Sequence, residues 1–390
     1  MEFEAIQRIK IPTFIQYPNM KLLQFREANW FFLGSFLLIV ATSLPLVAQQ
    51  KSRLTNQQIA SIDSTISTMM AKYQVPGVSV AVAKGSVIVW SKGYGKVDLE
   101  NDVPAKPTTV YRLASVSKSI TAVAVMQLVE KGKIDLDVPI QKYVPSFPQK
   151  KYPITTRQLL GHLSGVRHYS GEDEFNMKEY GSLSESLEIF QNDTLLHKPE
   201  TRLTYTTYGY VLLGVIVEAA SGISFTDYLQ KNIFKPAGMT ESSADEPLEI
   251  IHQRTRFYDV DDGKLHNARY INSSFRWPGG GLLSSAEDLA RFLMALQHGK
   301  LLQRVTLQQM TTSLKTTDGK STHYGLGWIV GLSQHPEVIW HGGVQPGATT
   351  AIAMIPQKDL SVVVLTNLGT LGGGEIDTVT GRIISILATN

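Results

Sequence analysis

The stretch "RLASVSKS", residues 112–119, places two serines and a lysine just before the apolar run "ITAVAVMQLVEKG". Serine is common at helix starts, because its hydroxyl accepts a hydrogen bond from a free backbone N–H group there. Capping would therefore explain Ser115 or Ser117. It leaves Lys118 unexplained, because the positive end of the helix dipole favours anions rather than cations.

A serine and a lysine three residues apart on a helix have a chemical use. Ser115 and Lys118 would lie on one helix face, with their Cβ atoms about 5–6 Å apart. A serine hydroxyl becomes a good nucleophile when a neighbouring base takes its proton. Lysine is such a base only when it is neutral, and burial against an apolar helix face lowers its pKa, as does the positive helix end. The stretch therefore predicts a serine nucleophile with a lysine base.

The composition excludes several other functions. The 390 residues are 43% hydrophobic and 18% charged, which is typical of a globular chain of one large domain or two lobes. The net charge of +3 is not clustered, so we expect no nucleic-acid partner. The absence of cysteine excludes disulfides, thiolate zinc sites and a cysteine nucleophile. Because HExxH spacing is also absent, we expect no metal and no cofactor.

The N-terminal region has the features of an export signal. Residues 30–47 carry no charge, Lys21 and Arg26 precede them, and the small residue Ala48 follows. The uncharged stretch is near the lower length limit for a spanning helix, so an uncleaved membrane tether through residues 30–47 stays open as an alternative. We expect an export signal or anchor over residues 1–48 and a catalytic domain over residues 49–390. The mature protein would then be periplasmic, secreted or membrane-anchored.

The residue patterns at the two ends of the chain predict the fold. Alternating apolar residues near both ends predict strands, with tight turns at Lys84-Gly85 and at residues 356–359. Helical spacing dominates between them, and Ser284 and Glu287 stand in capping-box register for one helix. This order predicts an α+β fold, an α/β sandwich: an antiparallel sheet built from both chain ends, flanked by helices, with an inserted, mostly helical lobe. The segments are a helix at 56–74, a hairpin at 76–98, the lobe at about 115–300, strands at 324–330 and 348–367, and a helix at 375–389.

Two further motifs follow the Ser-x-x-Lys stretch. They are "TYTTYGYVLLGVIVEAASG" at 204–222 and "WHGGVQPGA" at 340–348, and "GHLSGVRHY" and "RWPGGGLLSSAEDLARF" accompany them. In this order, over nearly everything after residue 56, the chain resembles the class C β-lactamase and serine D,D-peptidase (penicillin-binding protein) family. Within it, "HLSGVRHY" and "TYTTYGY" look most like the serine β-lactamase-like proteins whose best-known members are mitochondrial. The resemblance implies a β-lactamase/transpeptidase-like fold.

The resemblance also implies roles for the proton-transfer groups. Ser115 is then the nucleophile and Lys118 its partner base. Tyr205 matches the tyrosine of the family's Tyr-x-Asn motif, which shares a proton with the lysine and delivers it to the leaving group. A phenol does this at neutral pH only beside a cation, and Lys118 would be that cation.

The C-terminal motif implies a substrate-binding strand. His341 stands where the family's Lys-Thr-Gly strand has its lysine, although it could instead be a structural histidine. Gly342 and Gly343 would leave the strand edge bare for a substrate backbone. The backbone N–H groups of Ser115 and Val344 would form the oxyanion hole.

Two departures from the family pattern bear on the substrate. Thr207 stands in place of the motif's asparagine, and a hydroxyl reaches less far than an amide that both donates and accepts. Since that asparagine usually contacts the acylamido side chain of a β-lactam, we expect poor β-lactam turnover. His341 also weakens the fixed positive charge that attracts a substrate carboxylate. We take His162 and His168 as loop-packing or supporting groups.

Two functions from different classes remain. The first is a serine hydrolase that forms an acyl-enzyme with a small peptide, a D-amino-acid amide, an ester or a β-lactam. The second is a catalytically silent penicillin-binding-like sensor or scaffold protein. The joint presence of Ser115, Lys118 and Tyr205 favours the hydrolase, because a sensor has no need of all three.

Overall fold

The structure, a computed structural model, describes residues 53–388. The export signal predicted for residues 1–48 therefore lies outside the described residues. Among the described residues, no single helix is long and apolar enough to cross a membrane. Residues 207–221 and 225–237 satisfy length and composition together, with a bend of 75° between them.

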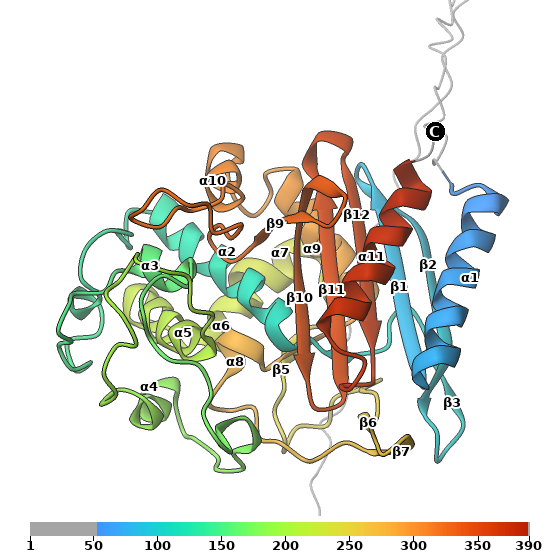
Figure 1. The fold of residues 1–390 in the computed structure, drawn as a ribbon, viewed down its shortest axis with the longest axis horizontal. Helices are drawn as coiled ribbons and strands as arrows, with labels where there is room; N and C mark the ends of the chain where they lie inside the picture. The colour runs from blue at the N-terminus through green and yellow to red at the C-terminus, as the bar shows by residue number, and fades with distance from the viewer. Residues whose placement is uncertain (1–52, 389–390) are drawn as a thin grey trace, which may run out of the picture. The chain divides into compact units, whose positions relative to one another are not determined.

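Seven strands form an antiparallel sheet (Figure 1). Its central pair joins the first strand of the described residues to the last one, with Val78 opposite Thr366. This pairing confirms the predicted sheet built from both chain ends. In spatial order the strands are β3 (Val103–Pro104), β2 (Val87–Asp98), β1 (Gly77–Lys84), β12 (Leu360–Thr366), β11 (Ala348–Ile355), β10 (His335–Gln345) and β9 (Ile329–Leu332).

Helices cover both faces of this sheet. In Figure 1, α1 and α11 lie in front of the sheet and α9 lies behind it. The side chains of β1 alternate accordingly: Val80 packs in the cluster shared with α1 and α11, while Ala81 belongs to the core on the α9 side. The α-helices are α1 (Asn56–Tyr73), α2 (Ser117–Glu130), α3 (Thr156–Leu160), α4 (Leu183–Ser186), α5 (Thr207–Ser221), α6 (Phe225–Leu229), α7 (Lys235–Ala237), α8 (Trp277–Gly280), α9 (Ala286–Gln297), α10 (Arg304–Met310) and α11 (Gly373–Ala388).

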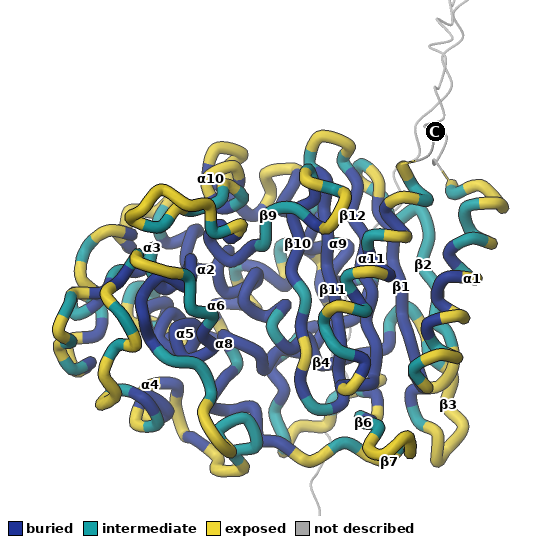
Figure 2. The backbone as a smooth tube through the Cα atoms, viewed as in Figure 1, coloured by how far each residue is buried: buried dark blue, intermediate teal, exposed yellow. Residues whose placement is uncertain are grey.

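The inserted lobe is mostly helical, as predicted, and α2 and α5 pack together inside it. Figure 2 shows this part of the chain in dark blue around α5. Residues 117–128 of α2 are all buried, so its N-terminal turn carries Lys118 into the interior. Short elements connect the helices: η1 (Ala114–Val116), η2 (Ile140–Lys142), η3 (Asp173–Phe175), η4 (Leu187–Ile189), η5 (Gln230–Phe234) and η6 (Pro356–Lys358), with small sheets of β4 (Tyr111–Arg112), β8 (Leu282–Ser284) and β5 (Ser243–Ala244), and of β6 (Tyr258–Asp261) and β7 (Lys264–Asn267).

Two details differ from the sequence prediction. The cap of α9 is Ser285, whose hydroxyl accepts from the Asp288 N–H at 3.2 Å, so the predicted pairing of Ser284 with Glu287 is wrong by one residue. Ser284 instead belongs to β8. The strand predicted over 324–330 begins only at Ile329, because Gly327, at φ +83°, turns the chain through the left-handed region.

Candidate active site

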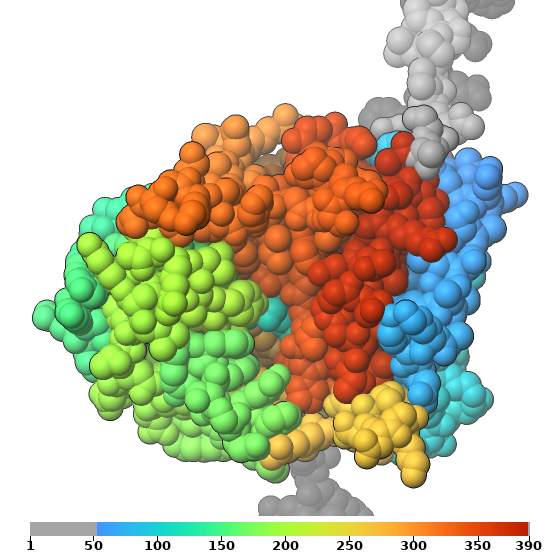
Figure 3. All heavy atoms as spheres, in the orientation of Figure 1, coloured from blue at the N-terminus to red at the C-terminus, as the bar shows by residue number. Residues whose placement is uncertain are grey.

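Ser115 lies beside the sheet, in the segment of chain that leads into α2. It occupies the short helix η1, which packs against β10. Figure 3 shows a hollow between the green atoms of the lobe and the orange and red atoms of the sheet, with teal atoms at its bottom, the colour of the chain near the start of α2. Ala114, just before Ser115, has φ +47°, a conformation that is costly for a non-glycine residue and that clusters at functional sites.

Lys118 lies beneath the serine, and three oxygen atoms surround its Nζ. Its Nζ is 3.0 Å from Ser115 Oγ, 3.1 Å from Thr207 Oγ1 and 2.5 Å from the Gly279 carbonyl oxygen. Its side chain is fully buried while Ser115 stays partly exposed. Burial, with the nearby positive charge of Arg276, holds the pKa of Lys118 well below its usual value. A neutral amine keeps one lone pair, so Lys118 can take the proton of Ser115.

Tyr205 flanks the same pair. Lys118 Nζ lies 4.8 Å from the centre of its ring. Burial raises the pKa of the Tyr205 phenol, and its hydrogen bond with the Ser115 side chain only partly opposes this effect. The phenol therefore stays protonated at neutral pH. In this environment Tyr205 is suited to donate a proton, while Lys118 is suited to accept one.

The hydroxyl of Thr207 faces Lys118. Thr207 is buried at the first turn of α5. The Tyr169 hydroxyl accepts from Arg276 Nη1 at 3.5 Å.

Arg276 is a buried cation that the sequence prediction did not single out. Its side chain is 1% exposed, and Nε and Nη2 have no hydrogen-bond partner among the described residues. It forms no ion pair with a described carboxylate, so its charge is not neutralised locally. Its backbone carbonyl accepts from Gly279, the residue whose own carbonyl binds Lys118. The motif "RWPGGG" contains this arginine, but its role follows only from the tertiary contacts.

The two histidines of the "GHLSGVRHY" segment hold the chain around Tyr205. His162 Nδ1 accepts from the Thr206 N–H at 3.1 Å, and His168 Nδ1 accepts from the Thr207 N–H at 3.2 Å. Burial, with the charge of Lys118 as the next cause, lowers the pKa of His168 to about 4 and that of His162 well below its usual value. Both rings are neutral at pH 7 and act as supporting groups.

His341 is a neutral member of the site. Its Nδ1 lies 2.6 Å from the Gly342 carbonyl, which only accepts, so Nδ1 carries the proton. Nε2 then accepts from the Tyr324 hydroxyl at 2.9 Å, a partner that the sequence prediction missed. Burial, followed by the effect of Lys118, lowers the pKa of His341 to about 3. His341 therefore supplies no fixed positive charge at neutral pH.

The edge of β10 next to the serine is open. The pairing of β9 with β10 ends at Trp340, and beyond it the described residues pair only on the β11 side. A Cβ on Gly343 would come within 2.5 Å of the Leu113 carbonyl oxygen and 2.8 Å of Ser115 N, so only glycine lets η1 lie this close. Gly342 faces the opposite side of the sheet, where a Cβ would meet Trp340. The side chain of Val344 is 44% exposed, and the oxyanion hole formed with Ser115 stays a prediction.

No metal centre accompanies these groups in the described part of the chain. Within residues 53–388, no cluster of three or more His, Asp or Glu side chains has an arrangement that could hold a metal ion.

Comparison with known proteins gives consistent likenesses. A family model described as Beta-lactamase matches residues 62–380. The chain is 33% identical to the human serine beta-lactamase-like protein LACTB, mitochondrial, over 73% of this chain and 69% of that protein. The octameric penicillin-binding protein homologue from Pyrococcus abyssi superposes with a TM-score of 0.73 at 29% identity, over 84% of this chain and 77% of that one. The D-amino acid amidase from Ochrobactrum anthropi SV3, at 23% identity and a TM-score of 0.72 over 85% and 98% of the two chains, shares the fold.

Proposed function

The chain belongs to the Beta-lactamase family, and from this premise we propose that it is a serine hydrolase that acts through an acyl-enzyme on a peptide, a D-amino-acid amide or an ester. One observation carries the proposal. A fully buried lysine without a carboxylate partner lies 3.0 Å from the hydroxyl of a partly exposed serine. Burial of an unpaired lysine costs stability, and a base for Ser115 gives that cost a purpose.

The acylation step follows from the placement of these groups. Neutral Lys118 takes the proton of the Ser115 hydroxyl as Oγ bonds to the substrate carbonyl carbon. The backbone N–H groups of Ser115 and Val344 stabilise the oxyanion that forms. Tyr205 gives its proton to the leaving group as the carbonyl carbon–leaving-group bond breaks, and Lys118 returns a proton to Tyr205. Water then releases the acyl group by the reverse sequence.

The same contacts set a preference among substrates. Thr207 is buried and its hydroxyl accepts from Lys118, so it does not present this hydroxyl to an acylamido group. His341 is neutral and offers no charge to a carboxylate on the leaving-group side. We therefore propose that β-lactams acylate Ser115 but that the resulting acyl-enzyme is hydrolysed slowly. Esters and simple amides turn over faster.

Covalent labelling tests the proposal against the silent sensor. A fluorophosphonate probe is expected to modify the chain once, with the mass increase on the peptide that contains Ser115. A chromogenic ester should be hydrolysed continuously, whereas a penicillin should give a lasting acyl-enzyme. A folded protein that shows neither labelling nor turnover of esters, amides or peptides would instead support the sensor or scaffold.

The pH dependence of acylation should depend on Arg276. In the wild type the lowered pKa of Lys118 increases the fraction of the amine that is uncharged at pH 7. Arg276→Met removes a positive charge that opposes protonation, so the pKa of Lys118 rises and acylation at pH 7 falls, by about tenfold. The rate should recover as the pH is raised, because deprotonation restores the base. Arg276→Lys, which keeps the charge, should retain most of the wild-type profile.

The measurement is kcat/KM for one chromogenic ester from pH 6 to pH 10 for all three proteins. A uniform loss at every pH in Arg276→Met would mean that the arginine acts on structure alone.

A further inference from the structure

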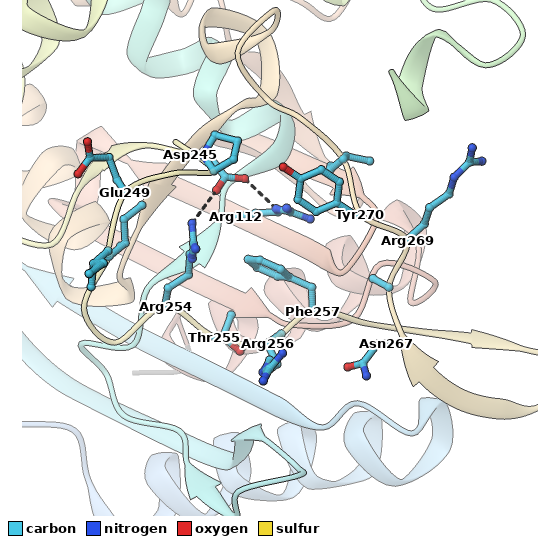
Figure 4. A pocket seen from close by; sticks show the side chains of 15 residues that line it. Arg112, Asp245, Glu249, Arg254, Thr255, Arg256, Phe257, Asn267, Arg269 and Tyr270 are labelled. Atoms are coloured by element: carbon cyan, nitrogen blue, oxygen red, sulfur yellow. Dashed lines mark hydrogen bonds and ion pairs between the residues drawn. The ribbon is translucent and has the colours of Figure 1, made fainter. Parts of the chain in front are cut away.

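A pocket outside the proton-transfer site lies where β10 ends. Its volume is about 680 Å³, and Arg112, Arg254, Phe257 and Tyr270 are among its lining residues (Figure 4). Arg112 Nη1 donates to the Pro346 carbonyl, the residue that follows β10, at 3.2 Å. The pocket is therefore anchored to the strand that runs past Ser115.

The pocket lies on the acyl side of the site. The ring of Tyr205, the proton donor to the leaving group, is 6.4 Å from that of His341, so the leaving group lies at the His341 end of the open edge. The acyl part of a substrate extends the other way, toward Pro346. Since an extended chain rises about 3.3 Å per residue, Pro346, which Arg112 contacts, lies roughly 10 Å beyond Gly343, a span that an acyl chain of about three residues covers.

The chemistry of the pocket favours an anion. Arg112 and Arg254 share one carboxylate, that of Asp245, at 2.9 Å and 3.4 Å. The Arg112 pair is buried and its guanidinium lies 3.9 Å over the Phe257 ring, so this arginine is fully engaged. Arg254 is not: its contacts, to Asp245 and to the Glu246 carbonyl, are both 3.4 Å long, and its side chain is 27% exposed.

The other charged residues around the pocket do not compensate for this excess. In Figure 4, Glu249 points away from Arg254, and the guanidinium groups of Arg256 and Arg269 point away from the space between Phe257 and Tyr270. Arg269 is paired with Glu172 at 3.0 Å. Arg254 is thus the under-coordinated cation of the pocket, beside two aromatic rings.

We propose that this pocket binds a carboxylate on the acyl side of an extended, peptide-like substrate. Arg254 contacts the carboxylate through its free N–H donors, and Phe257 and Tyr270 pack against the apolar part of the acyl chain. The inference rests on the proposed function and specifies its substrate class: acyl donors about three residues long that end in an acid group.

Two matched peptide esters test this proposal. They share one tripeptide acyl chain and differ only in the N-terminal cap, succinyl with a carboxylate or acetyl without one, and a short chromogenic ester serves as reference. In the wild type, kcat/KM is expected to be about tenfold higher for the succinyl ester, as for one charge-assisted hydrogen-bonded contact. Arg254→Met should remove this preference and leave the short ester unchanged.

Arg269→Met is the matched control, because it removes an equal charge from the same pocket wall but from a side chain that points away. Arg269→Met should keep the preference for the succinyl ester. If it lost this preference as fully as Arg254→Met, the preference would arise from the overall positive charge of the pocket wall, and the proposal would be overturned. Arg254→Gln replaces Arg254→Met if the latter has a lowered melting temperature.

The outcomes separate the pocket from the proposed function. Equal kcat/KM for the two capped esters, with normal turnover of the short ester, overturns the proposal that the pocket binds a carboxylate. The proposed hydrolase function is not affected by that result. If the protein shows neither labelling nor turnover of esters, amides or peptides, the proposed function fails, and calorimetric binding of the two capped peptide amides still tests the pocket. Tighter binding of the succinyl peptide that is lost in Arg254→Met supports the pocket, and equal binding overturns it.

Discussion

Ser115→Ala is expected to lower kcat/KM for ester hydrolysis by about 10⁴-fold or more and to leave the fold intact. The serine is partly exposed, and its Oγ contacts only groups of the proton-transfer site, so the hydroxyl contributes chemistry and little packing. Lys118 keeps its contacts with Thr207 and with the Gly279 carbonyl. The measurements are initial rates and the melting temperature of both proteins.

The matched control is Ser117→Ala, two residues along the chain. Ser117 is fully buried and accepts from the Leu282 N–H at 3.2 Å, so its loss should lower stability more than activity. Wild-type activity in a folded Ser115→Ala protein would show that Ser115 is not the nucleophile.

Lys118→Ala and Tyr205→Phe should each lower the acylation rate by about 10²–10⁴-fold, and the double variant should lose little more. The reason is that the two side chains serve one proton path: the amine takes the proton of Ser115 and the phenol delivers one to the leaving group. Once either group is missing, the path from Ser115 to the leaving group is broken, and the remaining group cannot complete the transfer. Their contact through the Tyr205 ring, 4.8 Å from Nζ, makes such coupling physically direct.

Single-turnover acylation by a chromogenic ester measures this coupling in the four proteins of a double-mutant cycle. If the two losses simply multiply, the groups act independently and the shared path is wrong. Lys118→Met, which nearly preserves the side-chain volume, shows whether a cavity rather than the missing base explains the loss in Lys118→Ala.

Much of the fold could be predicted because its signals are local. The alternation over 76–98 and 348–367 and the turns at Gly85 and 356–359 correspond to paired strands and tight connections in the structure. The errors are also local: Ser285 rather than Ser284 caps α9, since pairing within the small sheet takes up Ser284.

The residues of the candidate site differ in how far the sequence alone predicts them. Ser115 and Lys118 are three residues apart, so helix geometry alone places them together. Tyr205 needed the family resemblance, because nothing local separates it from the packed tyrosines nearby. Arg276 and Tyr324 were missed, because their importance depends on contacts between distant segments, such as the bond from Lys118 to Gly279, which spans 161 residues.

The pairing of β1 with β12 also determines when folding can be completed during synthesis. Gly77 N–H donates to the side chain of Asn367, 290 residues later, and the two central strands of the sheet come from opposite ends of the described chain. Contacts of such sequence separation form late and slow the search for the native state. On the ribosome, β1 and β2 emerge with an unpaired edge that must wait for almost the whole remaining chain. The nucleophile is therefore synthesised early and becomes reactive only once the last strand has docked.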